Sequence, residues 1–263
     1  MYLKKIILKF YKKLIFKYRK KIDLDAQSLD IKSLNKLFNH FGTDKGTEVI
    51  NPYITNSNNL DKKSVGHGYG DFYESNLDIF KNTKIKILEI GTWKGASVAA
   101  FFHYFNKAEI FCIDKNFKFK FKSKRINFIN CDTENISDIA KLEKFFIKKK
   151  IDYLDVIIDD GSHNYLDILS NFKNFFKKIK PGGYYIIEDF NHYKIHPSYI
   201  NDSPSNALDM DDIFQNIKNK VYFKSEILDK DFQKFCFKNV SSISVYKGIQ
   251  KFSYIAFFKR NNY

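Results

Sequence analysis

Two patterns of hydrophobic and polar positions divide the chain near residue 84. Before it, apolar residues recur at helical spacing. After it, short apolar runs alternate with amphipathic stretches, which is typical of strands alternating with helices. The pattern predicts helices over residues 1–22, 30–41, 95–105, 136–149 and 165–179, with another following the glycine-rich turn in 66–80. It predicts strands over residues 85–90, 109–114, 126–130, 154–159, 184–188, 221–225 and 253–258, and a polar loop over 43–60.

This alternation predicts an α/β fold. Strand–helix–strand units are right-handed and place their strands parallel, so we expect a doubly wound, mostly parallel sheet. The change of pattern also suggests two parts. Residues 1–80 are expected to form a basic amphipathic helix and a helical cap, and residues 81–263 the main α/β domain.

Two of the predicted strands end in carboxylates. DVIIDDGSHNY covers residues 155–165, and GYYIIED covers residues 183–189. Carboxylates that face one another repel unless a hard cation lies between them, and a nearby histidine can accept a proton. The sequence therefore predicts a metal-assisted reaction at this edge of the sheet. The residues concerned are Asp159, Asp160, His163, Glu188 and Asp189.

The turn after the first strand of the main domain reads EIGTWKG, from Glu89 to Gly95. Glycines at such a turn let a ligand approach the backbone, and the following helix N-terminus favours negative charge. Dinucleotide-binding proteins carry GxGxxG here, and Trp93 occupies the position of the second glycine. This bulk argues against a pyrophosphate and favours S-adenosylmethionine (SAM).

Acidic residues follow the next two strands. Asp114 ends the second strand, where a carboxylate can bridge ribose hydroxyls, and Asp132 follows the third, where it can accept from an adenine amino group. The alternative, carboxylates that only end strands or cap helices, stays open. The predicted cofactor-binding residues are Glu89, Gly91, Thr92, Gly95, Asp114 and Asp132, to which the family resemblance described below adds Tyr69.

The net charge of +15 is unevenly distributed. Nine of the 45 basic residues lie within residues 1–21, which contain no acidic residue, and the remaining 36 basic and 30 acidic residues leave an excess of 6. Nucleic acid is therefore not the expected partner. Three distant cysteines favour a reducing compartment. Without a recognisable signal peptide or membrane span, we expect a cytoplasmic protein.

The N-terminal helix carries an apolar stripe through Leu3, Ile7, Phe10, Leu14 and Tyr18, with lysines elsewhere. The stripe can pack on the body of the protein or on a second subunit in a homo-oligomer. A basic helix with aromatic anchors can also attach to an anionic membrane, which would place the protein at the inner face of the membrane. Nucleic-acid binding is the third alternative.

Five segments together carry a family resemblance: TDKGT followed by GHGYGDFYE, then EIGTWKG, IDDGSH and PGGYYIIED. In this order they resemble the metal-dependent SAM O-methyltransferases typified by the macrolide sugar O-methyltransferases, whose relatives are often labelled cephalosporin-hydroxylase-like. The resemblance spans residues 43–193 and implies a Rossmann-like class I methyltransferase.

The resemblance also implies roles for single residues. It makes His163 the catalytic base and Asp160, Glu188 and Asp189 the metal ligands. Asp159 would face the methionine end of SAM or hold a neighbouring loop, and four upstream residues would close over the cofactor: Asp44, Lys45, His67 and Tyr69. All-oxygen ligation suits Mg²⁺ or Mn²⁺.

The expected acceptor is a sugar hydroxyl, which rests on the resemblance. A nucleotide-linked sugar or a capsule or lipopolysaccharide precursor is the preferred substrate. We expect residues 191–212, which follow the metal-binding strand, to form part of the acceptor pocket. A catechol-like metabolite remains an alternative acceptor, and an RNA methyltransferase or a non-catalytic SAM-fold module are more distant ones.

Overall fold

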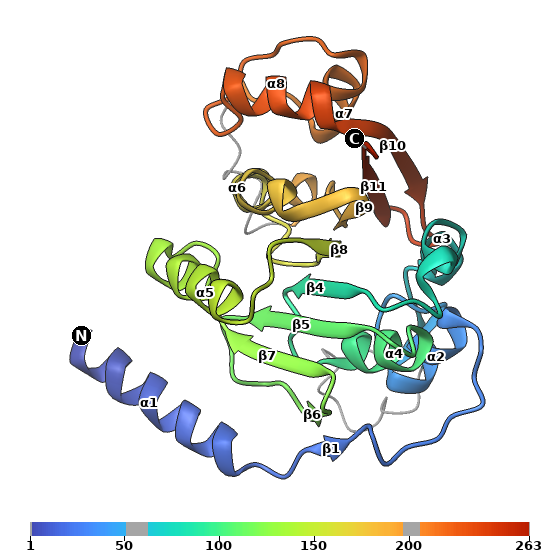
Figure 1. Cartoon of the computed structure of the whole chain (residues 1–263), viewed down its shortest axis with the longest axis vertical. Helices are drawn as coiled ribbons and strands as arrows, with labels where there is room; N and C mark the ends of the chain where they lie inside the picture. The colour runs from blue at the N-terminus through green and yellow to red at the C-terminus, as the bar shows by residue number, and fades with distance from the viewer. Residues whose placement is uncertain (1, 51–62, 197–205, 263) are drawn as a thin grey trace.

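A seven-stranded sheet forms the centre of the molecule (Figure 1). The computed structural model describes residues 2–50, 63–196 and 206–262. The strand order is β10-β11-β9-β8-β4-β5-β7; β4, β5, β7, β8 and β9 are parallel, and β11 and β10 run antiparallel at one edge. The strands are β4 (Lys86–Ile90), β5 (Glu109–Asp114), β7 (Ile126–Asn130), β8 (Leu154–Asp159), β9 (Ile179–Glu188), β10 (Val240–Lys247) and β11 (Tyr254–Arg260).

Helices cover both faces of this sheet (Figure 1). Side chains alternate between the faces of a strand, so Val156 and Ile158 of β8 join one apolar layer and Ile157 joins the other. The first layer includes α2 (Leu34–Phe41), α3 (Gly70–Leu77) and α4 (Ala96–Tyr104). The second includes α5 (Ile136–Lys148), α6 (Tyr165–Phe175), α7 (Met210–Asn219) and α8 (Lys230–Asn239).

The doubly wound, mostly parallel sheet is confirmed, but the C-terminal part of the prediction was partly wrong. Residues 221–225 do not form a strand. Their backbone is engaged by a side chain instead, because Phe223 N–H donates to Gln233 Oε1 and Gln233 Nε2 donates to the Phe223 carbonyl. In the same region the prediction missed β10, because its serines interrupt the apolar pattern that predicts a strand. Helices α7 and α8 were also missed.

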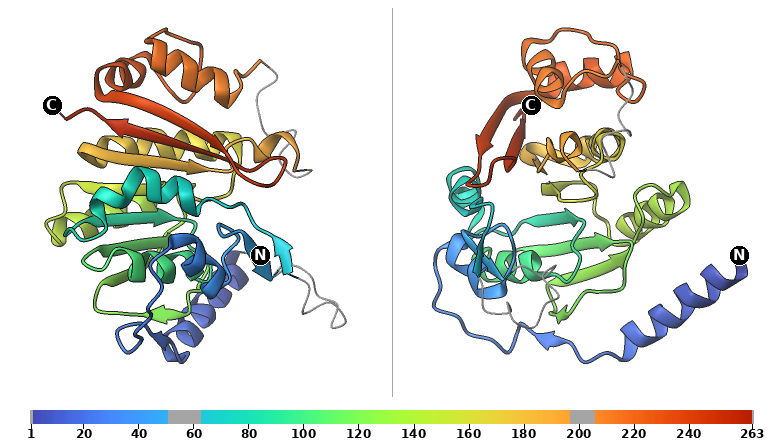
Figure 2. Two further views of the ribbon diagram at one scale, coloured as in Figure 1. Left: turned by 90° about the vertical axis from the view of Figure 1, so that its right-hand side faces the viewer. Right: turned by 180° about the vertical axis from the view of Figure 1, so that it is seen from behind.

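Smaller differences lie near the N-terminus. Residues 43–60 are not entirely loop, because β2 (Glu48–Ile50) pairs antiparallel with β3 (Lys63–Val65). A second small sheet joins β1 (Ile22–Asp23) to β6 (Phe121–Lys122). Helix α1 (Tyr2–Tyr18) extends away from the body as an arm (Figure 2). Among the described residues, no helix combines the length and apolar character that crossing a membrane requires.

Candidate active site

The candidate site lies where the chain leaves β4 and β8, which are neighbours in the sheet but lead to α4 and α6 on opposite faces. Ligands bind at such switch points in doubly wound sheets. The two loops touch here: a Cβ at Gly91 would lie 1.9 Å from the Asp160 carbonyl oxygen, and Gly91 has a φ of +85°. Glycine is therefore required at this position.

A cavity of about 660 Å³ opens above this junction. It is large enough for a nucleoside-sized ligand. Five of the seven predicted cofactor-binding residues line it: Gly91, Thr92, Gly95, Asp114 and Asp132. The cap contributes Thr43 and Asp44 to its wall, as the upstream motif suggested for Asp44.

Two backbone groups hold the Asp114 carboxylate at the cavity rim. Trp93 N–H donates to Oδ2 at 2.8 Å, and Asn116 N–H donates to Oδ1 at 2.6 Å. The Trp93 ring lies close to the Lys94 ammonium, 4.0 Å from the ring centroid. Trp93 thus helps, through its backbone N–H, to orient Asp114, the residue predicted to bind ribose.

Glu89 differs from the other predicted cofactor residues because it lies beneath the cavity and is fully buried. Neither carboxylate oxygen makes a hydrogen bond of normal geometry to any described residue. Burial raises the pKa of this carboxyl, and the positive charge of Lys45 offsets part of the rise. The Ser97 and Thr92 hydroxyls also lower this pKa, although neither makes a hydrogen bond of normal geometry. A buried acceptor that is so weakly satisfied fits a site that a ligand completes.

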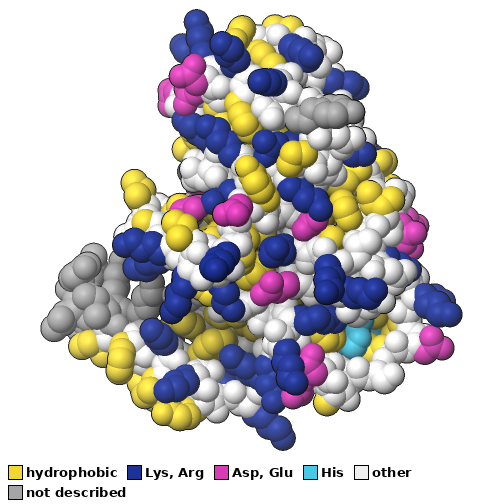
Figure 3. Space-filling view, in the orientation of Figure 1, with side chains coloured by type: hydrophobic (Ala, Val, Ile, Leu, Met, Phe, Trp, Pro, Cys, Tyr) yellow, Lys and Arg dark blue, Asp and Glu magenta, His cyan; other side chains and the backbone are white. Residues whose placement is uncertain are grey.

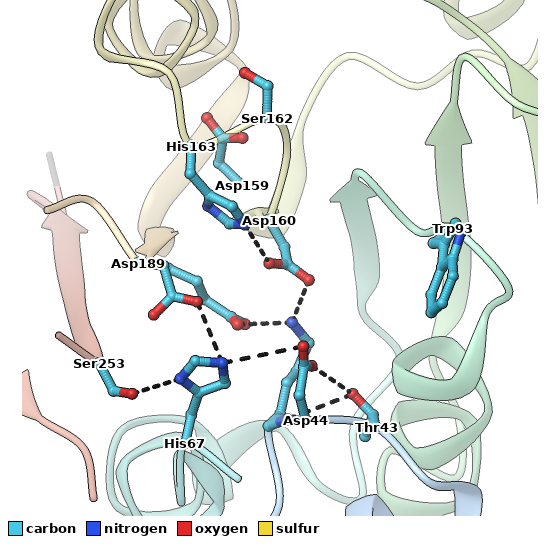
Figure 4. Close-up of polar contacts among 12 residues, drawn as sticks. Thr43, Asp44, His67, Trp93, Asp159, Asp160, Ser162, His163, Asp189 and Ser253 are labelled. Atoms are coloured by element: carbon cyan, nitrogen blue, oxygen red, sulfur yellow. Dashed lines mark hydrogen bonds and ion pairs between the residues drawn. The ribbon is translucent and has the colours of Figure 1, made fainter. Parts of the chain in front are cut away.

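Beside the cavity, an acid–histidine cluster forms from Asp160, His163 and Asp189 (Figure 4). One ligand atom from each lies within 4.8 Å of the others. His163 Nε2 is 3.6 Å from Asp160 Oδ1. This donor set, two carboxylates and an imidazole, fits a divalent cation. Asp160 and His163 also line the cavity, so the two features share a wall.

Glu188, the third predicted metal ligand, lies outside this group. Its Oε2 accepts from the Lys45 ammonium at 2.6 Å, and its Oε1 accepts from the Tyr73 hydroxyl. The same ammonium donates to Asp160 Oδ2 at 2.5 Å. Burial alone would lower the pKa of Lys45, but the Asp160 and Glu188 carboxylates raise it well above its usual value. Lys45 therefore acts as the resident cation between these two acids.

Asp189 is held from the cap side. The Tyr69 hydroxyl donates to Asp189 Oδ1 at 2.5 Å, and His67 Nε2 lies 3.5 Å from Oδ2. The His67 Nδ1 in turn contacts Ser253 Oγ at 2.5 Å (Figure 4). Among the residues described, Tyr69 is not in the cavity wall where we predicted it to bind the cofactor, because its hydroxyl is directed to Asp189.

The predicted role of Asp159 needs a correction as well. Its carboxylate accepts from Asn171 Nδ2 at 3.2 Å and from the Tyr185 hydroxyl at 3.1 Å, both buried. It does not line the cavity formed by the described residues. Asp159 therefore joins β8 to α6 and β9. Burial raises its pKa to about 7, and the two hydrogen bonds offset part of the rise.

Backbone conformation marks the same loops. Trp93, His163 and Asp189 adopt positive φ angles of 43°, 59° and 50°. Such backbone conformations are unfavourable for residues other than glycine. They occur often at functional sites, where the surrounding structure holds a side chain in a fixed orientation. Each of the three strand-end loops around the site thus carries one strained residue.

The segment predicted to form the acceptor pocket, residues 191–212, is described only in part. His192 lies within η4 (His192–Lys194), and its ring centroid is 5.6 Å from that of His163. Residues 197–205 lie outside the described residues. The described start of this segment therefore borders the acid–histidine cluster.

The strand order, the glycine turn and the cavity beside it are those of the class I methyltransferase fold. Sequence comparison agrees: the methyltransferase-domain family matches residues 88–190. Demethylmacrocin O-methyltransferase of Streptomyces fradiae is 27% identical over 130 residues, which are 47% of this chain and 32% of that protein. Mycinamicin VI 2''-O-methyltransferase of Micromonospora griseorubida is 28% identical over 130 residues, 47% of this chain and 31% of its own length.

Among solved structures, the MycE methyltransferase of mycinamycin biosynthesis, in complex with Mg and SAH, is similar with a TM-score of 0.63 at 20% identity. The similarity covers 87% of this chain and 55% of that one. The resemblance indicated by the motifs is thereby confirmed for the methyltransferase domain, which is of the type found in macrolide sugar O-methyltransferases. The chain spans about a third of the length of these curated relatives.

Proposed function

We propose that this protein is a SAM- and divalent-cation-dependent O-methyltransferase that acts on a sugar hydroxyl. One observation carries the proposal: Asp160 and His163 line the cavity beside the glycine turn and also belong to the cluster with Asp189. A methyl donor in the cavity and an acceptor at the cluster would therefore meet at a shared wall. The relatives named above, demethylmacrocin O-methyltransferase and mycinamicin VI 2''-O-methyltransferase, support the same chemistry.

The residues of the chain can be given roles in this reaction. Asp114 and Asp132 bind the nucleoside part of SAM, and Asp160 and Asp189 hold the cation. Such a cation, when bound, lowers the pKa of the acceptor hydroxyl. His163 accepts the proton of that hydroxyl, a role typically worth about 10²–10⁴-fold in rate. Glu188 remains a proposed third ligand, although Lys45 donates to its carboxylate in this structure.

The preferred acceptor is a nucleotide-linked sugar or a capsule or lipopolysaccharide precursor. The sugar specificity is supported by relatives such as mycinamicin VI 2''-O-methyltransferase. The histidine-rich start of residues 191–212 beside His163 is the part of the described chain that would contact this acceptor.

The test measures methyl transfer from labelled SAM to a panel of nucleotide sugars and catechols, with Mg²⁺ and with EDTA. Transfer to sugars that requires Mg²⁺ supports the proposal, and preferential transfer to catechols favours the alternative acceptor. His163→Ala should lower kcat by about 10²–10⁴-fold while SAM binding stays nearly unchanged. His103→Ala, at the end of α4, is the matched control and should retain kcat. Full activity in EDTA or in His163→Ala would exclude the mechanism.

A further inference from the structure

The outer face of helix α1 is an apolar surface that the described part of the fold leaves uncovered. Seven of its hydrophobic side chains are between 43% and 75% exposed: Ile7, Leu8, Phe10, Tyr11, Leu14, Ile15 and Tyr18. In Figure 3, hydrophobic side chains lie along the outer edge of the arm that α1 forms. A contiguous apolar face of this kind marks an interaction site.

The attachment of α1 to the body explains why this face points outward. Phe16 packs against Phe117 and Phe128, with ring centroids 5.6 and 5.1 Å away. On a helix with about 3.6 residues per turn, Phe16 lies on the side opposite Ile7, Leu14 and Tyr18. The body therefore contacts the back of the helix at Phe16, and the apolar face points to the surroundings (Figure 3).

Charge decides what can cover this face. Residues 1–21 contain nine basic and no acidic residues, and the rest of the chain also has an excess of 6 positive charges. A second copy would bring two such helices, or a helix and a basic body, into contact and would be repelled. Nucleic acid would satisfy the lysines but would leave the exposed isoleucine, leucine and phenylalanine side chains without an apolar partner.

We propose that α1 docks on the surface of an anionic lipid bilayer. Its apolar side chains would enter the boundary between headgroups and acyl chains, and the flanking Lys12, Lys13, Lys17 and Arg19, which are exposed, would lie among the anionic headgroups. The aromatic rings of Phe10, Tyr11 and Tyr18 suit this interface. The inference is independent of the reaction proposed above and concerns where the protein works.

The test measures co-sedimentation of the full chain with vesicles of phosphatidylcholine alone and with about one-third phosphatidylglycerol. Binding to the anionic vesicles is expected. The variant Lys12→Gln/Lys13→Gln/Lys17→Gln/Arg19→Gln should weaken it by roughly 600-fold, because each basic side chain near an anionic surface contributes roughly a fivefold factor. Ile7→Gln/Phe10→Gln/Leu14→Gln, which keeps helix-forming residues and does not touch the body, should also abolish binding.

A control removes the same charge elsewhere. Lys218→Gln/Lys224→Gln/Lys230→Gln/Lys234→Gln changes exposed lysines around α7 and α8, at the opposite end of the molecule from α1 (Figure 1), and should bind nearly as well as the original chain. Three outcomes would overturn the proposal. They are no binding to anionic vesicles, equal weakening by the control, and a self-association that the Ile7/Phe10/Leu14 variant abolishes while vesicle binding persists.

Discussion

Glu89 in β4 and Glu188 at the end of β9 occupy similar places in the sheet but have different surroundings. Both are almost fully buried, and burial raises the pKa of both carboxyls. Glu188 uses both oxygens, one for Lys45 and one for Tyr73. Glu89 has only the Ser97 and Thr92 hydroxyls nearby, and no hydrogen bond of normal geometry reaches either of its oxygens from the described residues. The protein itself thus satisfies the Glu188 carboxylate much more fully than the Glu89 carboxylate.

The largest effect is expected when the Lys45 ammonium, which contacts both Asp160 and Glu188, is removed. Lys45→Met leaves the buried Glu188 carboxylate and the partly exposed Asp160 carboxylate without their counter-charge. Breaking a buried ion pair in this way costs about 3–5 kcal/mol, so thermal unfolding should shift down by roughly 10 °C. The measurement is a calorimetric or circular-dichroism melt of the ligand-free protein.

A double variant separates charge from packing in this experiment. Lys45→Met/Glu188→Met should recover much of the lost stability, because no unpaired carboxylate remains at β9. An unchanged Tm in the Lys45→Met protein would show that the ammonium is not what stabilises these acids.

The next effect concerns the second partner of Glu188. Tyr73→Phe removes the hydroxyl that donates to Oε1 and leaves a buried acceptor unsatisfied, which should lower the free energy of unfolding by about 1–3 kcal/mol in a denaturant titration. Tyr104→Phe is the matched control, since its hydroxyl donates to the exposed Asp78 at 3.0 Å. Its effect should stay below about 0.5 kcal/mol. Equal losses in both variants would contradict the special burial of Glu188.

At Glu89 the expected effects have opposite signs. Glu89→Gln removes a buried ionisable group that is only weakly satisfied, so the ligand-free protein should gain about 1 kcal/mol of stability. Binding of S-adenosylhomocysteine should weaken by about 10-fold or more, because a charge-assisted hydrogen bond is lost. Melting curves and titration calorimetry measure the two quantities. A loss of stability together with unchanged affinity would show that Glu89 stabilises the fold and does not bind the cofactor.

The part of the site that lies close together along the chain could be predicted from the sequence. Residues fixed by one loop and its own strand were found: Gly91, Gly95 and Asp114 line the cavity, and Asp160 and His163 lie together three residues apart. The alternation of strands and helices likewise predicted the sheet, because both periods are local properties of the chain.

Partners that come from distant segments were harder to predict. Lys45 meets Glu188 across 143 residues, and Tyr69 meets Asp189 across 120. No local pattern encodes such pairs. The upstream TDKGT and GHGYGDFYE motifs drew attention to Lys45 and Tyr69, but as residues that close over the cofactor. One signal could have predicted the role of Lys45: a cluster of buried acidic side chains needs a positive charge beside it. Tyr73, although it lies in the same motif, was missed.

The smallest expected effect comes from a buried unpartnered group remote from both acids. His103 Nε2 lacks a hydrogen-bond partner among the described residues, and burial lowers the pKa of this half-buried ring, helped by Arg125 and His40. The unfolded chain therefore takes up the proton first, and stability should fall as the pH drops below about 6.5. His103→Phe keeps the ring stacked on Phe41 and should remove less than about 1 kcal/mol of this dependence, measured between pH 7.5 and 5.5. Because His103 does not line the cavity formed by the described residues, cofactor affinity should be the same in both proteins. A change in affinity would mean that an unpartnered buried atom does not by itself distinguish Glu89 as a binding residue.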